Sequence, residues 1–177
     1  MSRTGEAKSH GTTEKMISLT LEESRNLLYQ YCFAGNIDRV KRTIDEHSVD
    51  PDCEFGEALV YTIRGTGTQQ EKENILLYFK SLGVSLSIRE KTALKWAIKT
   101  DDLALIKFLQ SQGVDIVHDV EMHIFDAALR DDTTILKYLV DEGASISGEF
   151  LEDVSSLDEP LPEHVMRIMI GMCHTED

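Results

Sequence analysis

Apolar residues recur from Leu19 onward at the three- and four-residue spacing of amphipathic helices. Thr20 and Glu23 form the Thr-x-x-Glu pattern of a capping box, which predicts a helix that runs toward Tyr31. Continuous alternation of apolar and polar residues, the pattern of strands, is nearly missing from the chain. The three prolines fall where helix boundaries or loops are expected. The pattern therefore predicts a single all-α domain over residues 19–177.

Residues 1–18 are rich in Ser, Thr, Gly, Lys and Glu and show no periodicity, so we expect a disordered N-terminal tail. They lack the apolar segment of a secretory signal, and no run of about 18 apolar residues predicts a membrane span. The odd set of three cysteines, Cys32, Cys53 and Cys173, indicates free thiols in a reducing compartment rather than a disulfide framework. We therefore expect a cytoplasmic protein.

The chain repeats itself, because the segment 92–113 recurs thirty residues later as 122–143. The matched positions include Ala97 with Ala127, Asp101-Asp102 with Asp131-Asp132, Leu105 with Ile135, Leu109 with Leu139, and Gly113 with Gly143. Gly83 ends a similar apolar pattern upstream, and the earliest copy begins at Leu28. Repetition at this period is typical of proteins in which stacked units bury a core that no unit can bury alone.

Each unit has the pattern of a short helix, a polar turn and a second helix. An Asp or Asn in the turn, such as Asn36, is placed to cap the second helix, and we interpret the pairs Asp101-Asp102, Asp131-Asp132 and Asp141-Glu142 as caps and helix N-termini. The second helix ends at a glycine that suits left-handed backbone. These glycines are Gly83, Gly113 and Gly143.

The repeated pattern resembles the ankyrin repeat, which runs Thr-Pro-Leu-His-x-Ala-Ala, Gly-His, a helix with Ile/Val-Val and Leu-Leu, and Gly-Ala-Asp. The residues that match it are Thr92, Leu94, Ala97, Leu105, Ile106, Leu109, Gly113, Val114 and Asp115, then Ile124, Ala127, Ala128, Ile135, Leu136, Leu139, Gly143 and Ala144. The resemblance implies an all-α, ankyrin-type helix-pair solenoid with short hairpin or loop fingers. Its repeats would lie near 20–53, 54–88, 89–118 and 119–148, with a cap over 149–173.

The chain departs from the ankyrin pattern in ways that keep another helix-pair solenoid open. The proline is missing throughout, and the histidine position holds Tyr29, Val60, Lys95 and Phe125. The step between matched positions is thirty residues rather than about 33, so the fingers should be short. The second repeat carries extra residues around 64–70, where we expect a flexible loop between helices.

The end of the chain has the pattern of a terminal helix pair. We expect a first helix from Phe150 to Ser156 and a second from Glu163 to Met172, with Pro162 in its first turn. Apolar residues of the second helix fall on one face and should pack in the core rather than form a methionine-rich groove. These residues are Val165, Ile168, Met169 and Met172.

Charge is unevenly distributed along the chain. The net charge is −14, and residues 101–177 hold 4 basic and 18 acidic residues. This balance argues against binding to nucleic acid or to anionic membranes, both of which need clustered Lys and Arg. Two interpretations of the acidic half stay open: a solvated surface, or a docking face for a basic protein.

No residue pattern indicates catalysis, a cofactor or a metal centre. None of the six histidines lies in a zinc motif, and the glycine-rich stretch after Arg64 lacks the Lys-Ser/Thr ending of a phosphate-binding loop. His118, Asp119, Glu121 and His123 flank a predicted finger and could hold a metal, although an exposed loop is favoured. We therefore expect no enzyme activity.

The resemblance implies that a partner protein binds the concave face formed by the first helices and the fingers. The first-helix surface positions are Phe33, Arg64, Lys99 and Arg130. The finger positions are Glu54, Phe55, Arg89, Glu90, Lys91, His118 and Glu121. Trp96 has two open interpretations, packing between repeats or anchoring a partner.

These observations favour a non-enzymatic adaptor, inhibitor or escort that is monomeric alone and binds another protein, with a basic client as one version. Binding of nucleic acid or a membrane is not expected. The alternatives are an effector of an intracellular bacterium or virus that acts in the host cytosol, a small enzyme with an unrecognised site, and self-assembly through the repeat ends.

Overall fold

The computed structural model describes residues 19–118, 120–130 and 133–173, and within them it describes no side chain at 53–55 or 88–92. The described residues form these helices: α1 (Leu21–Phe33), α2 (Ile37–His47), α3 (Cys53–Arg64), α4 (Gln69–Ser81), α5 (Ile88–Lys99), α6 (Leu103–Ser111), α7 (Glu121–Ala128), α8 (Thr134–Asp141), α9 (Gly148–Ser155) and α10 (Glu163–Met172). Over the same residues there is no strand, only an isolated bridge between Ile146 and Cys173. The all-α prediction is confirmed there. The expected tail, 1–18, lies outside the described residues.

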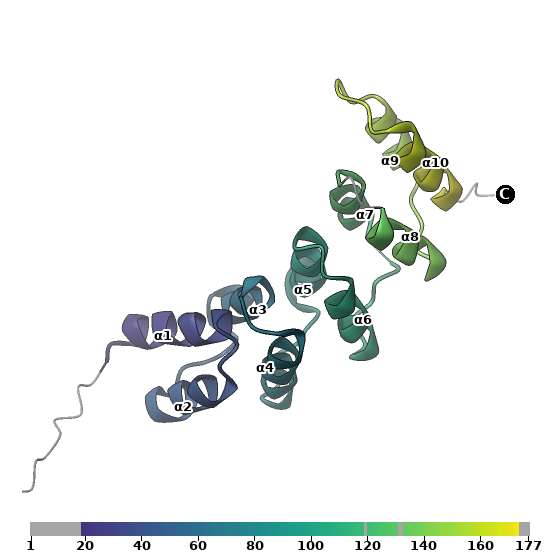
Figure 1. The fold of residues 1–177 in the computed structure, drawn as a ribbon. Coiled ribbons are helices and arrows are strands. Elements are labelled where there is room, and N and C mark those ends of the chain that lie inside the picture. Colours follow the sequence, from purple (N-terminus) through teal and green to yellow (C-terminus); the bar gives the residue numbers. More distant parts are fainter. Residues whose placement is uncertain (1–18, 119, 131–132, 174–177) are drawn as a thin grey trace, which may run out of the picture.

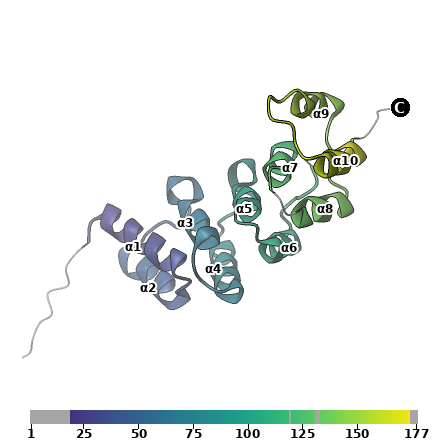
Figure 2. The ribbon, with the colours of Figure 1, turned by 45° about the horizontal axis from the view of Figure 1, so that its top comes forward.

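The helices lie in two rows. In the odd-numbered row, α1 packs on α3, α3 on α5 and α5 on α7. In the even-numbered row, α2 packs on α4, α4 on α6 and α10 on α8, and each of the first four pairs, α1–α2 to α7–α8, packs across the rows. Both views show this arrangement (Figures 1 and 2). The rows follow a curve, with the odd-numbered helices on its inner side (Figure 1).

The core lies between the two rows. Leu28, Leu59, Leu94 and Ile124 occupy equivalent positions in α1, α3, α5 and α7, and all four are buried. They belong to one apolar cluster with the residues that the second helices turn inward, among them Leu76, Phe79, Leu105, Ile106, Leu109, Ile135, Leu136 and Leu139. Because neighbouring pairs share this cluster, each pair depends on the next for the burial of its apolar surface.

Local signals set most helix ends. Thr20 and Thr68 form capping boxes with Glu23 and Glu71, and the first of these was predicted. Asn36 and Asp102 accept hydrogen bonds from the backbone of α2 and α6, as predicted. The predicted glycines adopt left-handed backbone with φ of 89° at Gly83, 90° at Gly113 and 93° at Gly143.

Two predicted acidic caps have other outcomes. Asp131-Asp132 lies outside the described residues. Asp141 ends α8 and Glu142 follows it, so this pair lies at a helix C-terminus and not at an N-terminus. The interpretation of that pair as an N-terminal cap is therefore wrong. Glu142 instead accepts a hydrogen bond from the Gln110 amide at 2.6 Å, which joins α6 to the end of α8.

The predicted flexible loop after α3 is a close contact between two backbones. The Thr66 amide donates to the Phe33 carbonyl at 2.8 Å, and a Cβ atom added to Gly65 would overlap the same carbonyl. A Cβ atom added to Gly35 would lie 2.8 Å from the Gly67 Cα. The glycines therefore allow the turns that follow α1 and α3 to touch. The remaining extra residues of this repeat lengthen α4, which has 13 residues against 9 in α6.

The predicted hairpin fingers are not found in the described residues. The linkers between pairs, 48–52, 82–87, 112–120 and 142–147, contain turns, and no strand pairing is found in their described parts. Residues expected in fingers lie instead in the first turns of α3, α5 and α7. These are Glu54, Phe55, Arg89, Glu90, Lys91 and Glu121. The short repeat leaves too few residues for a hairpin once the first helix extends toward its N-terminus.

The terminal pair agrees closely with its prediction. The second helix, α10, has the predicted ends, and Val165, Met169 and Met172 are buried in the core. The first helix, α9, begins two residues early because the Ser147 side chain accepts from the Phe150 amide at 3.2 Å. Pro162 lies immediately before α10 and not within its first turn.

None of the described helices combines the length and the apolar character that are needed to cross a membrane.

Replacement of Gly65 by Ala should destabilise the protein by about 2 kcal/mol or more, because the new methyl group overlaps the Phe33 carbonyl. The matched control is Gly113→Ala, which meets no atom within 4 Å and bears only the left-handed φ, at a cost of about 1 kcal/mol. Urea unfolding followed by circular dichroism measures both free energies. Equal losses would contradict the close contact after α3.

Hydrogen bonds from the backbone and side chain of Thr68 lower the pKa of Glu71. A lowered pKa in the folded state stabilises the protein above the unfolded-state pKa, and this stability is lost as the pH falls through the folded-state pKa. Glu71→Gln keeps an acceptor and removes the titration. We expect unfolding measured from pH 7 to below about 4 to show a smaller acid-induced loss of stability in this variant. Identical pH profiles would contradict the prediction.

Candidate partner-binding site

One side of the odd-numbered row presents equivalent residues from successive helices to solvent. On each helix they are spaced at i, i+4 and i+7, so they lie on one face. We call this set the inner stripe. Its described members are Asn26, Gln30 and Phe33 on α1, Glu57, Tyr61 and Arg64 on α3, Trp96 and Lys99 on α5, and Met122, Asp126 and Leu129 on α7 and its C-cap. All are exposed or half-buried, and the residues between them are mostly buried.

Trp96 lies at the centre of the inner stripe and joins two repeats. The Arg64 guanidinium on α3 lies over its ring, 4.6 Å from the centroid. The Lys99 ammonium, one turn later on α5, lies 5.9 Å from the same centroid. Packing of Trp96 between repeats is therefore confirmed, and its role as a partner anchor stays a prediction. The attraction between a cation and an aromatic ring restricts the Arg64 side chain.

Lys99 continues the contacts toward α7. Its ammonium lies 3.6 Å from an Asp126 carboxylate oxygen. The Arg130 guanidinium donates to the Lys99 carbonyl, so it ties the turn after α7 to the end of α5. Arg130 was predicted as a surface position of the first helix, but Leu129 is the structural equivalent of Phe33, Arg64 and Lys99. Alignment of Ile124 with Leu94 would have identified Leu129 from the sequence.

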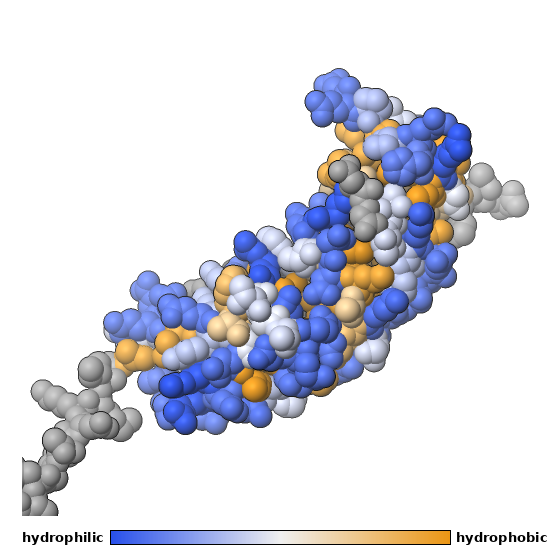
Figure 3. All heavy atoms as spheres, viewed as in Figure 1, coloured by the Kyte–Doolittle hydropathy of each residue, from blue (hydrophilic) through white to orange (hydrophobic). Residues whose placement is uncertain are grey.

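Large apolar side chains are exposed along the inner stripe. Their relative exposures are 41% for Phe33, 38% for Tyr61, 65% for Met122 and 59% for Leu129. The Tyr61 ring stacks on Tyr29, with 4.9 Å between centroids, which fixes its position. Figure 3 shows orange patches within a mostly hydrophilic surface along the molecule. Of these four residues, only Phe33 and Leu129 are at equivalent positions, and exposed apolar groups that gather on one face are typical of a binding surface.

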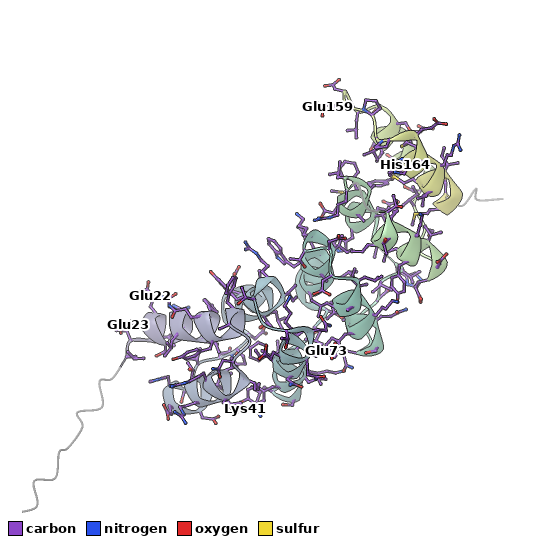
Figure 4. The ribbon with its side chains drawn as sticks, in the orientation of Figure 1. Glu22, Glu23, Lys41, Glu73, Glu159 and His164 are labelled. Atoms are coloured by element: carbon purple, nitrogen blue, oxygen red, sulfur yellow. The ribbon has the colours of Figure 1, made fainter. Side chains whose placement is uncertain are left out.

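In the even-numbered row, lysines also lie over aromatic rings of the neighbouring helix pair. Lys41 lies 5.3 Å from the Tyr78 ring centroid and Lys107 lies 5.1 Å from that of Tyr138. Burial, with smaller contributions from the charges of Asp45 and Glu142, raises the pKa of Tyr78 and Tyr138. Figure 4 labels Lys41 on this row. These contacts join neighbouring pairs, and Leu77 and Leu82 of this row are also exposed.

The remaining predicted binding residues do not join the inner stripe in the described structure. The side chains of Phe55, Arg89, Glu90 and Lys91 lie outside the described residues. His118 is exposed, with Nδ1 3.1 Å from an Asp115 oxygen. Glu121 accepts a hydrogen bond from the Ser147 amide at 2.6 Å, so it connects α7 to the start of α9.

The described residues do not assemble a metal centre. They contain no group of three or more His, Cys, Asp or Glu side chains placed to hold an ion. His123 is buried in α7 and Glu121 is bonded to Ser147, and Asp119 of the arrangement considered from the sequence lies outside the described residues. Cys32 is buried in α1, where its thiol packs as a small apolar group.

Charge differs between the inner stripe and the C-terminal helices. Helix α5 holds four basic residues and one acidic residue. Exposed carboxylates gather near the C-terminal end of the described chain, on α9 and on the loop before α10, where Glu159 lies at the tip (Figure 4). Arg64 is exposed, and no described carboxylate lies within ion-pair distance of it. The inner stripe therefore combines apolar groups with an unneutralised guanidinium.

Comparison with known proteins gives no match to a family model, to a curated protein or to a solved structure.

A double-mutant cycle tests the contact that organises the inner stripe. Arg64→Met and Trp96→Leu should show a coupling of about 0.5–1 kcal/mol in the free energy of unfolding, because each change removes the same interaction. Arg64→Met combined with Leu82→Ala is the control and should be additive. Zero coupling between positions 64 and 96 would contradict the contact.

Proposed function

We propose that the chain is an ankyrin-type helix-pair solenoid that acts as a non-enzymatic protein–protein interaction module, with the inner stripe as its binding surface. One observation carries this proposal: Phe33, Tyr61, Met122 and Leu129 are exposed on the inner stripe, on α1, on α3, and on α7 with its C-cap. Stacked repeats provide an extended surface of this kind. Each helix contributes one or two contact positions, so a partner would be recognised by the order of these positions along the row.

The chemistry of the inner stripe supports recognition of a protein. Binding energy in protein interfaces is concentrated in Trp, Tyr and Arg, and all three occur at its centre as Trp96, Tyr61 and Arg64. The contacts of Trp96 with Arg64 and of Tyr61 with Tyr29 hold these side chains in place before a partner arrives. Preorganised side chains lose little conformational entropy on binding, which favours affinity.

The proposal includes a role and a place of action. An adaptor, inhibitor or escort in the cytoplasm needs a surface of this type and no catalytic group. The Arg64 guanidinium, which pairs with no described carboxylate, does not favour a basic client at this surface. A basic client would have to bind the acidic C-terminal half instead.

Replacement of Phe33 and Leu129 together by Gln should remove partner binding while the fold is kept, because both side chains are exposed. The matched control replaces Leu77 and Leu82 by Gln, which have similar exposure and lie on or directly after α4 in the other row. The measurement is affinity capture from a native extract with each protein immobilised, after circular dichroism has shown equal helix content.

We expect the wild type and the control to capture the same protein in equal amounts. The inner-stripe variant should recover about tenfold less, which corresponds to roughly 1.4 kcal/mol of lost binding energy. Equal capture by all three proteins would contradict the placement of the site. Loss of capture by the control alone would move the site to the even-numbered row.

A further inference from the structure

The Arg64 guanidinium is the one strongly basic group of the inner stripe that the described residues leave unneutralised. It lies over the Trp96 ring at 4.6 Å, and its side chain is exposed at the end of α3. Lys99, the other cation of the inner stripe, already pairs with Asp126 at 3.6 Å. A guanidinium that is oriented by a ring and has no anionic partner keeps its hydrogen-bond donors available for a bound group.

The donor geometry of Arg64 selects the kind of group that it would bind. A guanidinium presents its N–H donors in a planar fork that matches the two oxygens of a carboxylate. Contact with an aromatic face leaves the edge of the guanidinium plane free for such a pair. A cationic partner group would be repelled at this position, and a neutral amide would make weaker hydrogen bonds.

Apolar side chains lie close to Arg64 along the inner stripe. Tyr61 precedes it by three residues on the same face of α3, and Phe33 is its equivalent on the neighbouring α1. Both are partly exposed. The turn after Arg64 is joined to Phe33 by the hydrogen bond from the Thr66 amide. The packed backbones therefore hold a charged position and an apolar position at a defined separation.

We propose that the inner stripe takes an acidic segment of a partner protein, in which one Asp or Glu carboxylate pairs with Arg64 and a nearby apolar side chain contacts Tyr61 and Phe33. This inference rests on the proposed function and specifies the partner. The net charge of −14 does not oppose it at the site, because exposed charges farther away than about 8 Å are largely screened at physiological salt.

The test uses the full chain and a phage-displayed library of random peptides of about twelve residues. Enriched peptides are synthesised and titrated against the protein. Trp96 is the only tryptophan in the chain and touches Arg64, so its emission reports binding at this position. Peptides that contain tryptophan are followed by fluorescence anisotropy of an attached dye.

The variants separate the charge of Arg64 from its structural contact with Trp96. Arg64→Gln removes the charge, and Arg64→Lys keeps the charge and the contact with the ring but loses the planar fork. Lys137→Gln is the matched control, because Lys137 is an exposed cation on α8 in the other row. Each variant is first checked by circular dichroism for unchanged helix content.

We expect enriched peptides to carry Asp or Glu within about four residues of an apolar side chain. Arg64→Gln should weaken their binding by about tenfold or more, with Arg64→Lys intermediate and Lys137→Gln within about twofold of wild type. In the Arg64→Gln variant, replacement of the Asp or Glu of the peptide by Asn or Gln should weaken peptide binding little further. Binding should also weaken as salt is raised.

Enrichment of peptides without acidic residues, equal binding to Arg64→Gln, or no enrichment at all would overturn the inference. If the enriched peptides carry no acidic residue and their binding is lost in the Phe33→Gln, Leu129→Gln variant, this inference is overturned and the proposed function stands. Peptides unaffected by either variant would count against both. Sedimentation equilibrium tests whether the chain associates with itself. If the wild type forms a dimer that Arg64→Gln dissociates, the inner stripe binds a second copy of this chain and the inference is overturned.

Discussion

The structure depends on the inability of each helix pair to bury its own apolar face. Leu28, Leu59, Leu94 and Ile124 are buried only because a second helix and the neighbouring pair cover them. This packing fixes the rotation of every odd-numbered helix. It therefore also fixes which residues of that helix remain outside the core. The inner stripe is the consequence of this constraint, because the same register that buries one face repeats the opposite face along the row.

The contacts between pairs give the inner stripe its order. Gly65 and Gly67 let the turns after α1 and α3 approach closely, and the hydrogen bond from the Thr66 amide to Phe33 joins the two turns. Farther along, Arg64 lies over Trp96, and Lys99 pairs with Asp126. Each of these contacts runs from the end of one odd-numbered helix to the next helix. A surface held in this way can present aromatic and charged groups with little loss of side-chain entropy on binding.

The features that the sequence predicted well are local ones. Capping by Thr20, Asn36 and Asp102, and left-handed backbone at Gly113, depend on a few neighbouring residues, so a single sequence reveals them. The ends of α10 follow from its proline and its apolar face in the same way. The fold beyond these elements depends on how the helix pairs pack.

The features that the sequence did not predict arise from contacts between repeats. The need for Gly65 comes from the Phe33 carbonyl, a residue of the preceding pair. The contact of Arg64 with Trp96 requires the relative register of α3 and α5, which no pattern within either helix supplies. Finger residues were expected from a family resemblance, whereas the short repeat lets α3 and α5 extend over them. Arg130 was predicted from the sequence where the structure has Leu129, because a shift of one residue at a helix end changes which side chain faces solvent.

Hydrogen–deuterium exchange of the chain with its captured partner tests the central claim, partner binding along the inner stripe, most directly. The account predicts added protection in the last turns of α1, α3, α5 and α7, with α4 and α6 unchanged. Protection confined to α9 and α10, or to the even-numbered row, would contradict it.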